Sequence, residues 1–178
     1  MPRLRKLDKG QGNQQANDLM NDLDSKKKLL NIFRSMANSP AVLDSYLKFS
    51  GAMNSAKLDA KNREAIALAV SQSNRCEYCL AAHTVIGKGA GLDEPSIKDA
   101  RQGRSKDRKT QGAVTLARAI VEKRGNVNDQ DIKGARDAGL DDGELAEVVG
   151  TVVQTLFTNY FNHLNQTEVD FPKVALEV

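Results

Sequence analysis

The chain contains 178 residues and has a net charge of +3, which comes from 26 Lys and Arg and 23 Asp and Glu. The first ten residues hold four of these cations and one of the anions, so the rest of the chain is neutral. A nucleic-acid-binding protein needs a basic face rather than a basic end. The charge distribution therefore argues against that class.

Membrane insertion and export are disfavoured as well. The longest purely apolar run covers residues 65–70, which is far too short to span a bilayer. Polar GQGNQQ at residues 10–15 follows the basic start, where a signal peptide would carry an apolar stretch. Two cysteines do not make a disulfide scaffold either. We expect a cytoplasmic protein that does not bind membranes.

Apolar residues recur at three- and four-residue spacings, and no segment alternates long enough to predict a strand. The sequence therefore predicts an all-α fold, a single-domain bundle of about eight helices. Residues 1–25 are expected to form an N-terminal extension, in which a loose basic arm passes into a polar helix. Residues 26–178 are expected to form the helical domain.

Start and stop signals define the helices in the first half of the chain. Residues 26–38 carry an amphipathic stripe, and Ser39 followed by Pro40 begins the next helix. Asp59 is the predicted cap of a helix that enters residues 65–70. Because that run is apolar on all sides, this helix is expected to be buried.

The next helix is predicted to begin at Asn74 as its cap, with Glu77 as the capping-box partner three residues later. The tetrapeptide AGLD occurs at residues 90–93 and again at residues 138–141. In both places Gly is expected to end one helix and Asp to cap the next. Other predicted helices are 105–124, 128–137 and 141–165, followed by an extended tail from Thr167.

The two cysteines, Cys76 and Cys79, form a C-x2-C pair that His83 extends to C-x2-C-x3-H on one predicted helix. At about 100° per residue, the three side chains fall within roughly 60° of one another. Cys76 lies near the helix start, where the dipole favours a thiolate, and Cys79 lies one turn before an imidazole that could take its proton. In a cytosolic chain this arrangement is typical of a dithiol that closes reversibly into a disulfide.

Two other interpretations of this motif stay open. Buried cysteines in helical proteins often act as small apolar residues. Alternatively, Cys76, Cys79, His83 and His163 could supply four ligands to zinc, although ligands lined up along one helix surround a tetrahedral ion poorly. The spacing favours redox chemistry over both.

The remaining polar residues are expected to be structural. Glu64 by itself is predicted to be a solvated charge near the start of its helix. His163 is predicted to be a satisfied core histidine, and residues 106–109 a solvated helix start.

The segment from Glu64 to His83, with the pattern E-x11-C-x2-C-x3-H, resembles the alkylhydroperoxidase D-like branch of the carboxymuconolactone decarboxylase superfamily. Residues 157–172 are similar to the peroxidase-related subgroup of that family. The resemblance covers about residues 26–172. It implies an all-helical fold that assembles into homo-oligomers, either trimers or hexamers.

The resemblance also implies peroxidase chemistry without haem, flavin or metal. Carried over by position, Cys79 is the attacking thiol, Cys76 the resolving thiol and His83 the general base, while Glu64 orients or charges the histidine. A dithiol partner, such as a lipoyl-bearing protein, would reduce the enzyme, and a small hydroperoxide would be the substrate. Tyr78 departs from the family pattern, because the best-characterised branch has a histidine of its proton relay there, and a tyrosine is a poor base at neutral pH.

The sequence therefore predicts an enzyme, an alkyl hydroperoxide reductase-like thiol peroxidase or thiol–disulfide oxidoreductase. Lactone decarboxylation, the other chemistry of the superfamily, is a second hypothesis, although its members generally lack the cysteine pair. A third hypothesis is a non-catalytic, redox-sensing helical oligomer whose dithiol only changes its assembly.

Overall fold

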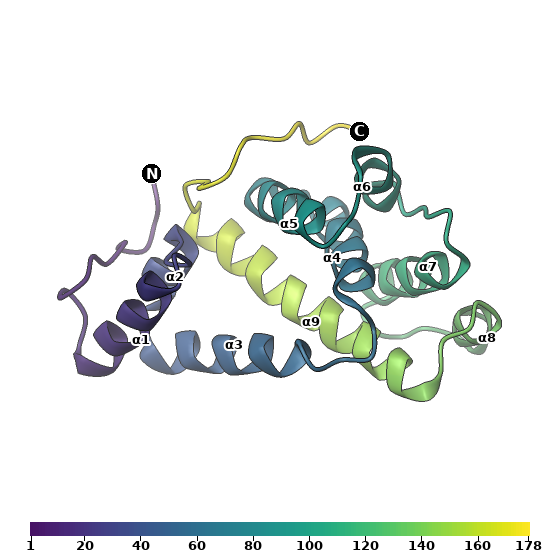
Figure 1. Ribbon diagram of the computed structural model, residues 1–178, viewed down its shortest axis with the longest axis horizontal. Coiled ribbons are helices and arrows are strands. Elements are labelled where there is room, and N and C mark those ends of the chain that lie inside the picture. Colours follow the sequence, from purple (N-terminus) through teal and green to yellow (C-terminus); the bar gives the residue numbers. More distant parts are fainter.

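The computed structural model describes residues 1–178 and contains nine α-helices and no strand, which confirms the all-α prediction (Figure 1). None of the nine helices combines the length and the apolar character that a bilayer crossing requires. The helices are α1 (Gln14–Ser25), α2 (Asn31–Met36), α3 (Pro40–Met53), α4 (Ala60–Ser73), α5 (Glu77–Gly89), α6 (Glu94–Arg101), α7 (Arg108–Glu122), α8 (Asp129–Asp137) and α9 (Asp142–Asn165).

The longest helix, α9, runs diagonally across the molecule, with α1, α2 and α3 on one side of it and α4 to α8 on the other (Figure 1). The buried apolar residues form two clusters. The larger one joins α4 to α6, α7, α8 and α9. The smaller one joins α1, α2 and α3 to the start of α5 and includes both cysteines. Every residue from 65 to 71 is buried, which confirms the prediction of a central helix there.

The two AGLD tetrapeptides form the same turn, as predicted. Gly91 and Gly139 adopt φ angles of +94° and +102°, a left-handed conformation that glycine adopts without strain. Asp93 and Asp141 then cap α6 and α9 by accepting a backbone N–H from the first turn. Short polar signals of this kind are read correctly from the sequence because the turn uses only local hydrogen bonds.

The basic N-terminal segment is not a loose arm, so that expectation is wrong. Leu7 is buried in the smaller cluster, and the backbone N–H of Leu4 donates to Asn165 Oδ1 over 2.8 Å. Lys6 pairs with Glu168 at 2.9 Å. The segment is therefore docked onto the end of α9 by one buried leucine and by these polar contacts. The sequence prediction considered only its positive charge, which favours a solvated arm.

The helix predicted over residues 26–38 is shorter than expected and covers only Asn31–Met36. Lys27 has a φ of +56°, and the N–H of Lys28 donates to Leu23 O over 2.8 Å. These contacts close the end of α1 in a left-handed turn, so the chain re-enters a helix only after residue 30.

The segment 106–109 is not simply a solvated helix start. Lys109 Nζ lies 2.5 Å from the carboxylate of Glu144, whose side chain is 2% exposed. Burial disfavours ionisation of that carboxyl, but the hydrogen bonds from Lys109 and from the N–H of Asp141 hold the pKa of Glu144 below its ordinary value. The lysine therefore keeps a buried charge paired.

Helix α9 buries Val148 and Val152 in the larger cluster, but its other buried residues are polar, and several apolar residues lie on its exposed face. Hydroxyls of Thr151 and Thr155 donate to carbonyls one turn earlier on the same helix, so their burial leaves no unpaired donor. The buried polar residues of α9 that follow Glu144 are Thr151, Thr155, Thr158, Asn159, Asn162 and Asn165, and the exposed apolar ones are Val149, Val153, Phe157, Tyr160 and Leu164. An amphipathic helix of a monomer normally shows the reverse arrangement.

Candidate functional site

The turn between α4 and α5 positions the first cysteine. Arg75 adopts a φ of +53°, and the N–H of Cys76 donates to Ser71 O over 3.0 Å, which ends α4 in a Schellman motif. Cys76 itself is the N-cap of α5, and its Sγ accepts from the N–H of Cys79 over 3.3 Å. The predicted Asn74 cap is therefore wrong, because Asn74 is still part of the end of α4.

The side chain of Asn74 is used to hold this turn against α9. The side-chain Nδ2 of Asn74 donates to Asn159 Oδ1 over 2.8 Å, and the backbone carbonyl oxygen of Asn74 lies 2.9 Å from His163 Nε2. His163 is thus an exposed residue that supports the turn, not the core histidine that the sequence predicted. Two residues of α9 fix the backbone that leads into Cys76.

The two cysteines form a disulfide in this structure, with their Cα atoms 5.3 Å apart. Each of them is 2% exposed. On α9, Asn162 Nδ2 donates to Cys79 Sγ over 3.4 Å, while Asn162 Oδ1 is buried without a partner. Leaving a buried polar atom unpaired costs about 1–3 kcal/mol. The amide of Asn162 nevertheless directs its N–H group at the sulfur of Cys79.

One turn further along α5, His83 meets Glu64 of α4. Nδ1 of His83 lies 2.8 Å from Glu64 Oε2, and the two side chains are 20% and 16% exposed. Gly87, one turn further along α5, packs closely against Leu92, since a Cβ there would lie 3.1 Å from Leu92 Cδ1. Glu64 is therefore not the solvated charge that its position alone predicted.

The contact with Glu64 defines the chemistry of the imidazole. A carboxylate accepts the hydrogen of Nδ1, which leaves Nε2 of the neutral ring as a proton acceptor. His83 makes no hydrogen bond to either sulfur in the disulfide form. The predicted site residues are thus assembled as two pairs, the disulfide and the histidine–glutamate pair, one helical turn apart on α5.

The two pairs face different cavities. His83 and Glu64 line a cavity of about 310 Å³ between α3, α4, α5 and α9. Cys76 and Asn162 line another, of about 480 Å³, which is bounded by the chain after α9. Cys79 lies between Cys76 and His83 on α5, and it lines neither of the two cavities. A group that enters at Cys76 and a group that enters at His83 therefore approach the couple from opposite ends.

The cavity at His83 combines apolar and polar side chains. Met53 and Ile86 contribute apolar surface, whereas Gln154 and Arg63 are polar. Burial raises the pKa of Tyr46, which also lines this cavity. Its hydroxyl therefore stays protonated at neutral pH.

Tyr78, which replaces the relay histidine of the resembling family, faces the C-terminal tail. Its hydroxyl donates to Asp170 Oδ2 over 2.6 Å, and its ring packs edge-on against Phe171 with centroids 5.8 Å apart. Burial and the neighbouring Asp170 carboxylate raise the pKa of Tyr78 far above its ordinary value. Tyr78 is an anchor for the tail and does not act as a base.

Tyr78→Phe is expected to loosen the tail and to lower the free energy of unfolding by about 1–2 kcal/mol, because Asp170 loses a charge-assisted hydrogen bond. Urea unfolding and the rate of proteolysis within residues 167–178 measure both effects. Tyr160→Phe is the matched control, because Tyr160 is 61% exposed. Equal behaviour of the two variants would contradict the anchoring role.

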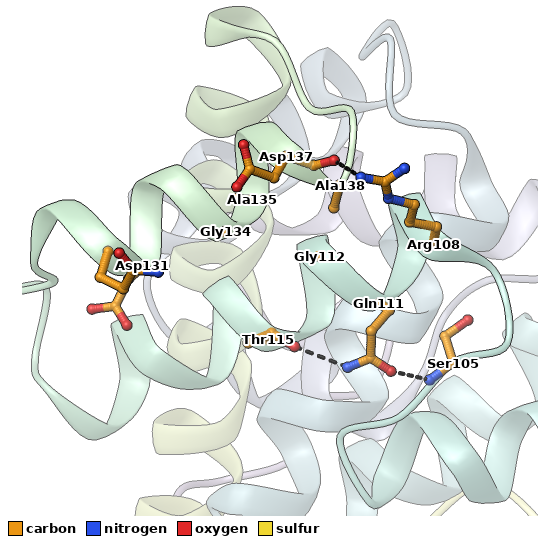
Figure 2. Close-up of a pocket in the computed structure, with 11 residues that line it drawn as sticks. Ser105, Arg108, Gln111, Gly112, Thr115, Asp131, Gly134, Ala135, Asp137 and Ala138 are labelled. Carbon is orange, nitrogen blue, oxygen red and sulfur yellow. Dashed lines mark hydrogen bonds between the residues drawn. The ribbon is translucent and has the colours of Figure 1, made fainter.

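A further cavity, of about 450 Å³, lies between α7 and α8, away from the cysteines. Figure 2 shows that several of its polar residues are joined by hydrogen bonds. Arg108 donates to the carbonyl oxygen of Asp137, and Gln111 joins the N–H of Ser105 to the hydroxyl of Thr115. No cysteine or histidine lines this cavity, so it takes no part in the chemistry of the C-x2-C-x3-H motif.

No three His, Cys, Asp or Glu side chains of the chain are grouped so that they could hold a metal ion. Of the four residues weighed as zinc ligands, Cys76 and Cys79 are joined to each other, and His163 bonds to a backbone carbonyl. The donor set therefore does not fit a tetrahedral zinc site.

Several residues of the site were not predicted from the sequence. Asn162, Asn159, Asp170 and Tyr46 all contact or enclose the motif but lie far from it in the chain. A signal was present in α9, where Thr and Asn recur at three- and four-residue spacing along one face. Such a row of polar side chains along one face of an otherwise apolar helix indicates that these side chains are buried and make specific hydrogen bonds.

Residues 40–105 match the carboxymuconolactone decarboxylase family, which confirms the resemblance inferred from the motif. The matched region contains all four predicted site residues, Glu64, Cys76, Cys79 and His83. No curated protein matches the chain in sequence.

Solved structures share the fold at low sequence identity. An uncharacterised peroxidase-related protein from Ralstonia eutropha JMP134, described as an alkylhydroperoxidase AhpD core, has a TM-score of 0.84 and 16% identity, with 95% of this chain and 92% of that chain covered. A peroxidase-related protein from Silicibacter sp. TM1040 has a TM-score of 0.79 and 16% identity, over 98% and 96% of the two chains. The debrominase Bmp8, as a cysteine-to-alanine variant in complex with 2,3,4-tribromopyrrole, has a TM-score of 0.79 and 13% identity, over 96% and 92%.

Proposed function

We propose that this chain, which over residues 40–105 belongs to the carboxymuconolactone decarboxylase family, is a thiol peroxidase that reduces small hydroperoxides through its cysteine pair. The observation that carries the proposal is the Cys76–Cys79 disulfide on α5, one turn before a histidine held by a glutamate. A disulfide next to a positioned base contains what thiol-based peroxide reduction needs. Two solved structures with this fold are named peroxidase-related, which supports a peroxidase function.

The reductive half begins at Cys76, because this cysteine lines the cavity beside the tail. A thiolate of a dithiol reductant, such as a lipoyl group, attacks Cys76 Sγ. The disulfide bond breaks, and its electron pair goes to Cys79 Sγ. The second thiol of the reductant then displaces Cys76 and leaves as a cyclic disulfide. A reducing compartment such as the cytoplasm suits an enzyme that must be reset in this way.

The oxidative half uses Cys79 and His83. The Cys79 thiolate attacks one oxygen of the hydroperoxide, the O–O bond breaks, and the leaving alkoxide takes a proton from His83, whose charge Glu64 balances. Cys79 is now a sulfenic acid. The Cys76 thiolate attacks its sulfur, water leaves, and the disulfide forms again. The alcohol and water carry both oxygens, and the dithiol supplies both electrons. No metal or organic cofactor takes part in this cycle.

A coupled assay tests the proposal directly. Reduced protein is mixed with cumene hydroperoxide or hydrogen peroxide and a dithiol reductant, and peroxide loss is followed against time. We expect consumption well above that of the free dithiol, with one disulfide formed per peroxide in a single turnover. Peroxide loss no faster than with free dithiol, together with an oxidation-dependent change in assembly size, would favour the redox-sensing oligomer instead.

The same preparations discriminate the remaining chemistries. A carboxylactone substrate tests the decarboxylase hypothesis, and turnover that survives loss of both cysteines would support it. Brominated pyrroles test the reaction of the debrominase with the same fold, in which reduction of a carbon–bromine bond would also require the cysteines.

We also propose that the protein works as a homo-oligomer. Exposed apolar side chains of α9 and α3 form a groove of about 380 Å³, and monomers rarely leave such contiguous apolar surface open. Tyr46, which lines this groove, also lines the cavity at His83. A second copy packed there would close one wall of the proposed active site. The groove is lined by Ala41, Val42, Ser45, Tyr46, Phe49, Val153 and Phe157.

Val153→Glu is expected to dissociate the oligomer, because a carboxylate in an apolar interface cannot keep its hydration. Light scattering on a sizing column measures the mass. Gln130→Glu adds the same charge on exposed α8 and should leave the mass unchanged. A wild-type protein that is monomeric at micromolar concentration would contradict the proposal.

A further inference from the structure

Among the side chains outside the predicted motif, Asn162 makes the closest connection to its chemistry. It is the only side chain that donates a hydrogen bond to either cysteine sulfur, with Nδ2 3.4 Å from Cys79 Sγ. It is 5% exposed, and it presents this donor although its Oδ1 is left buried without a partner. The amide nitrogen of Asn162 is therefore the group that faces the sulfur.

The strength of the hydrogen bond from Asn162 to Cys79 Sγ depends on the redox state of the sulfur. A disulfide sulfur carries no charge and accepts hydrogen bonds weakly. A thiolate carries a full negative charge, and hydrogen bonds to charged acceptors are about twice as strong as neutral ones. A fixed N–H beside Cys79 consequently stabilises the reduced, ionised couple more than the disulfide.

We infer that Asn162 is a catalytic residue that stabilises the Cys79 thiolate. The inference rests on the proposed function, in which Cys79 is the leaving group of reduction and the nucleophile of peroxide attack. When a reductant thiolate attacks Cys76 Sγ and the disulfide bond breaks, the electron pair arrives on Cys79 Sγ, directly against the N–H of Asn162. The same contact then keeps Cys79 ionised for the oxidative half.

Other groups also act on this thiol and remain in place when Asn162 is changed. His83, Tyr78 and Glu77 lie on the same helix. The titratable and charged side chains on the neighbouring elements are Lys28 before α2, Tyr46 on α3, Arg63 and Glu64 on α4, Arg75 in the turn, His163 on α9, and Glu168, Asp170 and Lys173 in the tail. A comparison at position 162 therefore isolates the amide.

The first measurement is the rate of Cys79 alkylation by iodoacetamide against pH, in a Cys76→Ser background so that only Cys79 reacts. Asn162→Leu is expected to raise the pKa of Cys79 by about one unit and to lower the rate at neutral pH about tenfold. Asn162→Asp, which keeps the shape but adds a like charge, should raise the pKa further. Thr158→Val is the matched control, because its buried hydroxyl bonds only to its own helix.

The second measurement is the equilibrium of the wild-type cysteine pair with dithiothreitol, at a pH where Cys79 is ionised. Asn162→Leu should shift it about tenfold towards the disulfide. If Asn162→Leu does not fold, the isosteric Asn162→Asp replaces it and should shift the equilibrium in the same direction. A folded variant whose thiol pKa and equilibrium stay within twofold of the parent would overturn the inference. Neither measurement uses peroxide, so failure of the peroxidase assay is a separate result.

Discussion

Cys79→Ser is expected to lower peroxide consumption by at least about a thousandfold, to the rate seen without enzyme. A serine hydroxyl is not ionised at neutral pH and forms neither a sulfenic acid nor a disulfide. Loss of a covalent nucleophile typically removes several orders of magnitude in turnover. The coupled dithiol assay measures the decrease.

Cys76→Ser is the matched control, since it removes the other sulfur of the same couple. This variant keeps the nucleophile but has no resolving thiol, so without the dithiol reductant it should consume one equivalent of peroxide and then stop as a sulfenic acid. Trapping with dimedone and mass spectrometry identifies the oxidised residue. A Cys79→Ser protein that turns over at the wild-type rate would contradict the proposed mechanism.

His83→Ala is expected to lower turnover by about 10²–10⁴-fold, the usual contribution of a positioned general acid or base. The variant also loses the group that assists ionisation of Cys79, so its alkylation profile should move to higher pH. The sign follows from the chemistry: without a proton acceptor nearby, a higher pH is needed to form the same fraction of thiolate. Iodoacetamide rates and peroxide turnover on one preparation measure both effects.

Two further variants make the result for His83 interpretable. Glu64→Gln keeps a hydrogen-bond partner for Nδ1 but removes the charge, and it should produce a smaller decrease than His83→Ala. Lys88→Ala changes an exposed residue of the same helix whose ion pair with Glu94 lies at the surface, and it should leave turnover unchanged. An unchanged profile in His83→Ala would show that another group takes the proton.

The helices and most of their ends were predictable because they depend on local signals. Asp59, Asp93 and Asp141 cap helices as expected. The failure at Asn74 is instructive, because its side chain is a good cap but is bound by Asn159 of α9. A tertiary contact removed the residue from a local role that its type predicted.

The residues of the candidate site also fall into those that local spacing predicts and those that depend on distant contacts. The spacing of Cys76, Cys79 and His83 on one helix could be predicted because that spacing places three side chains along one face. The partner of His83 came only from the family resemblance. Asn162 was missed altogether, because contacts between α5 and α9 join positions 83 residues apart.

Periodicity, caps and residue spacing were enough to predict the all-helical fold, the central buried helix and a cysteine pair on the same helix as an imidazole. Each of these signals acts over a few residues, so the amino-acid order contains it in full. The docked N-terminus, the anchoring of the tail by Tyr78 and the separate cavities at Cys76 and His83 became visible only in the folded molecule. Those outcomes depend on which distant side chains meet, and a local pattern does not contain that information.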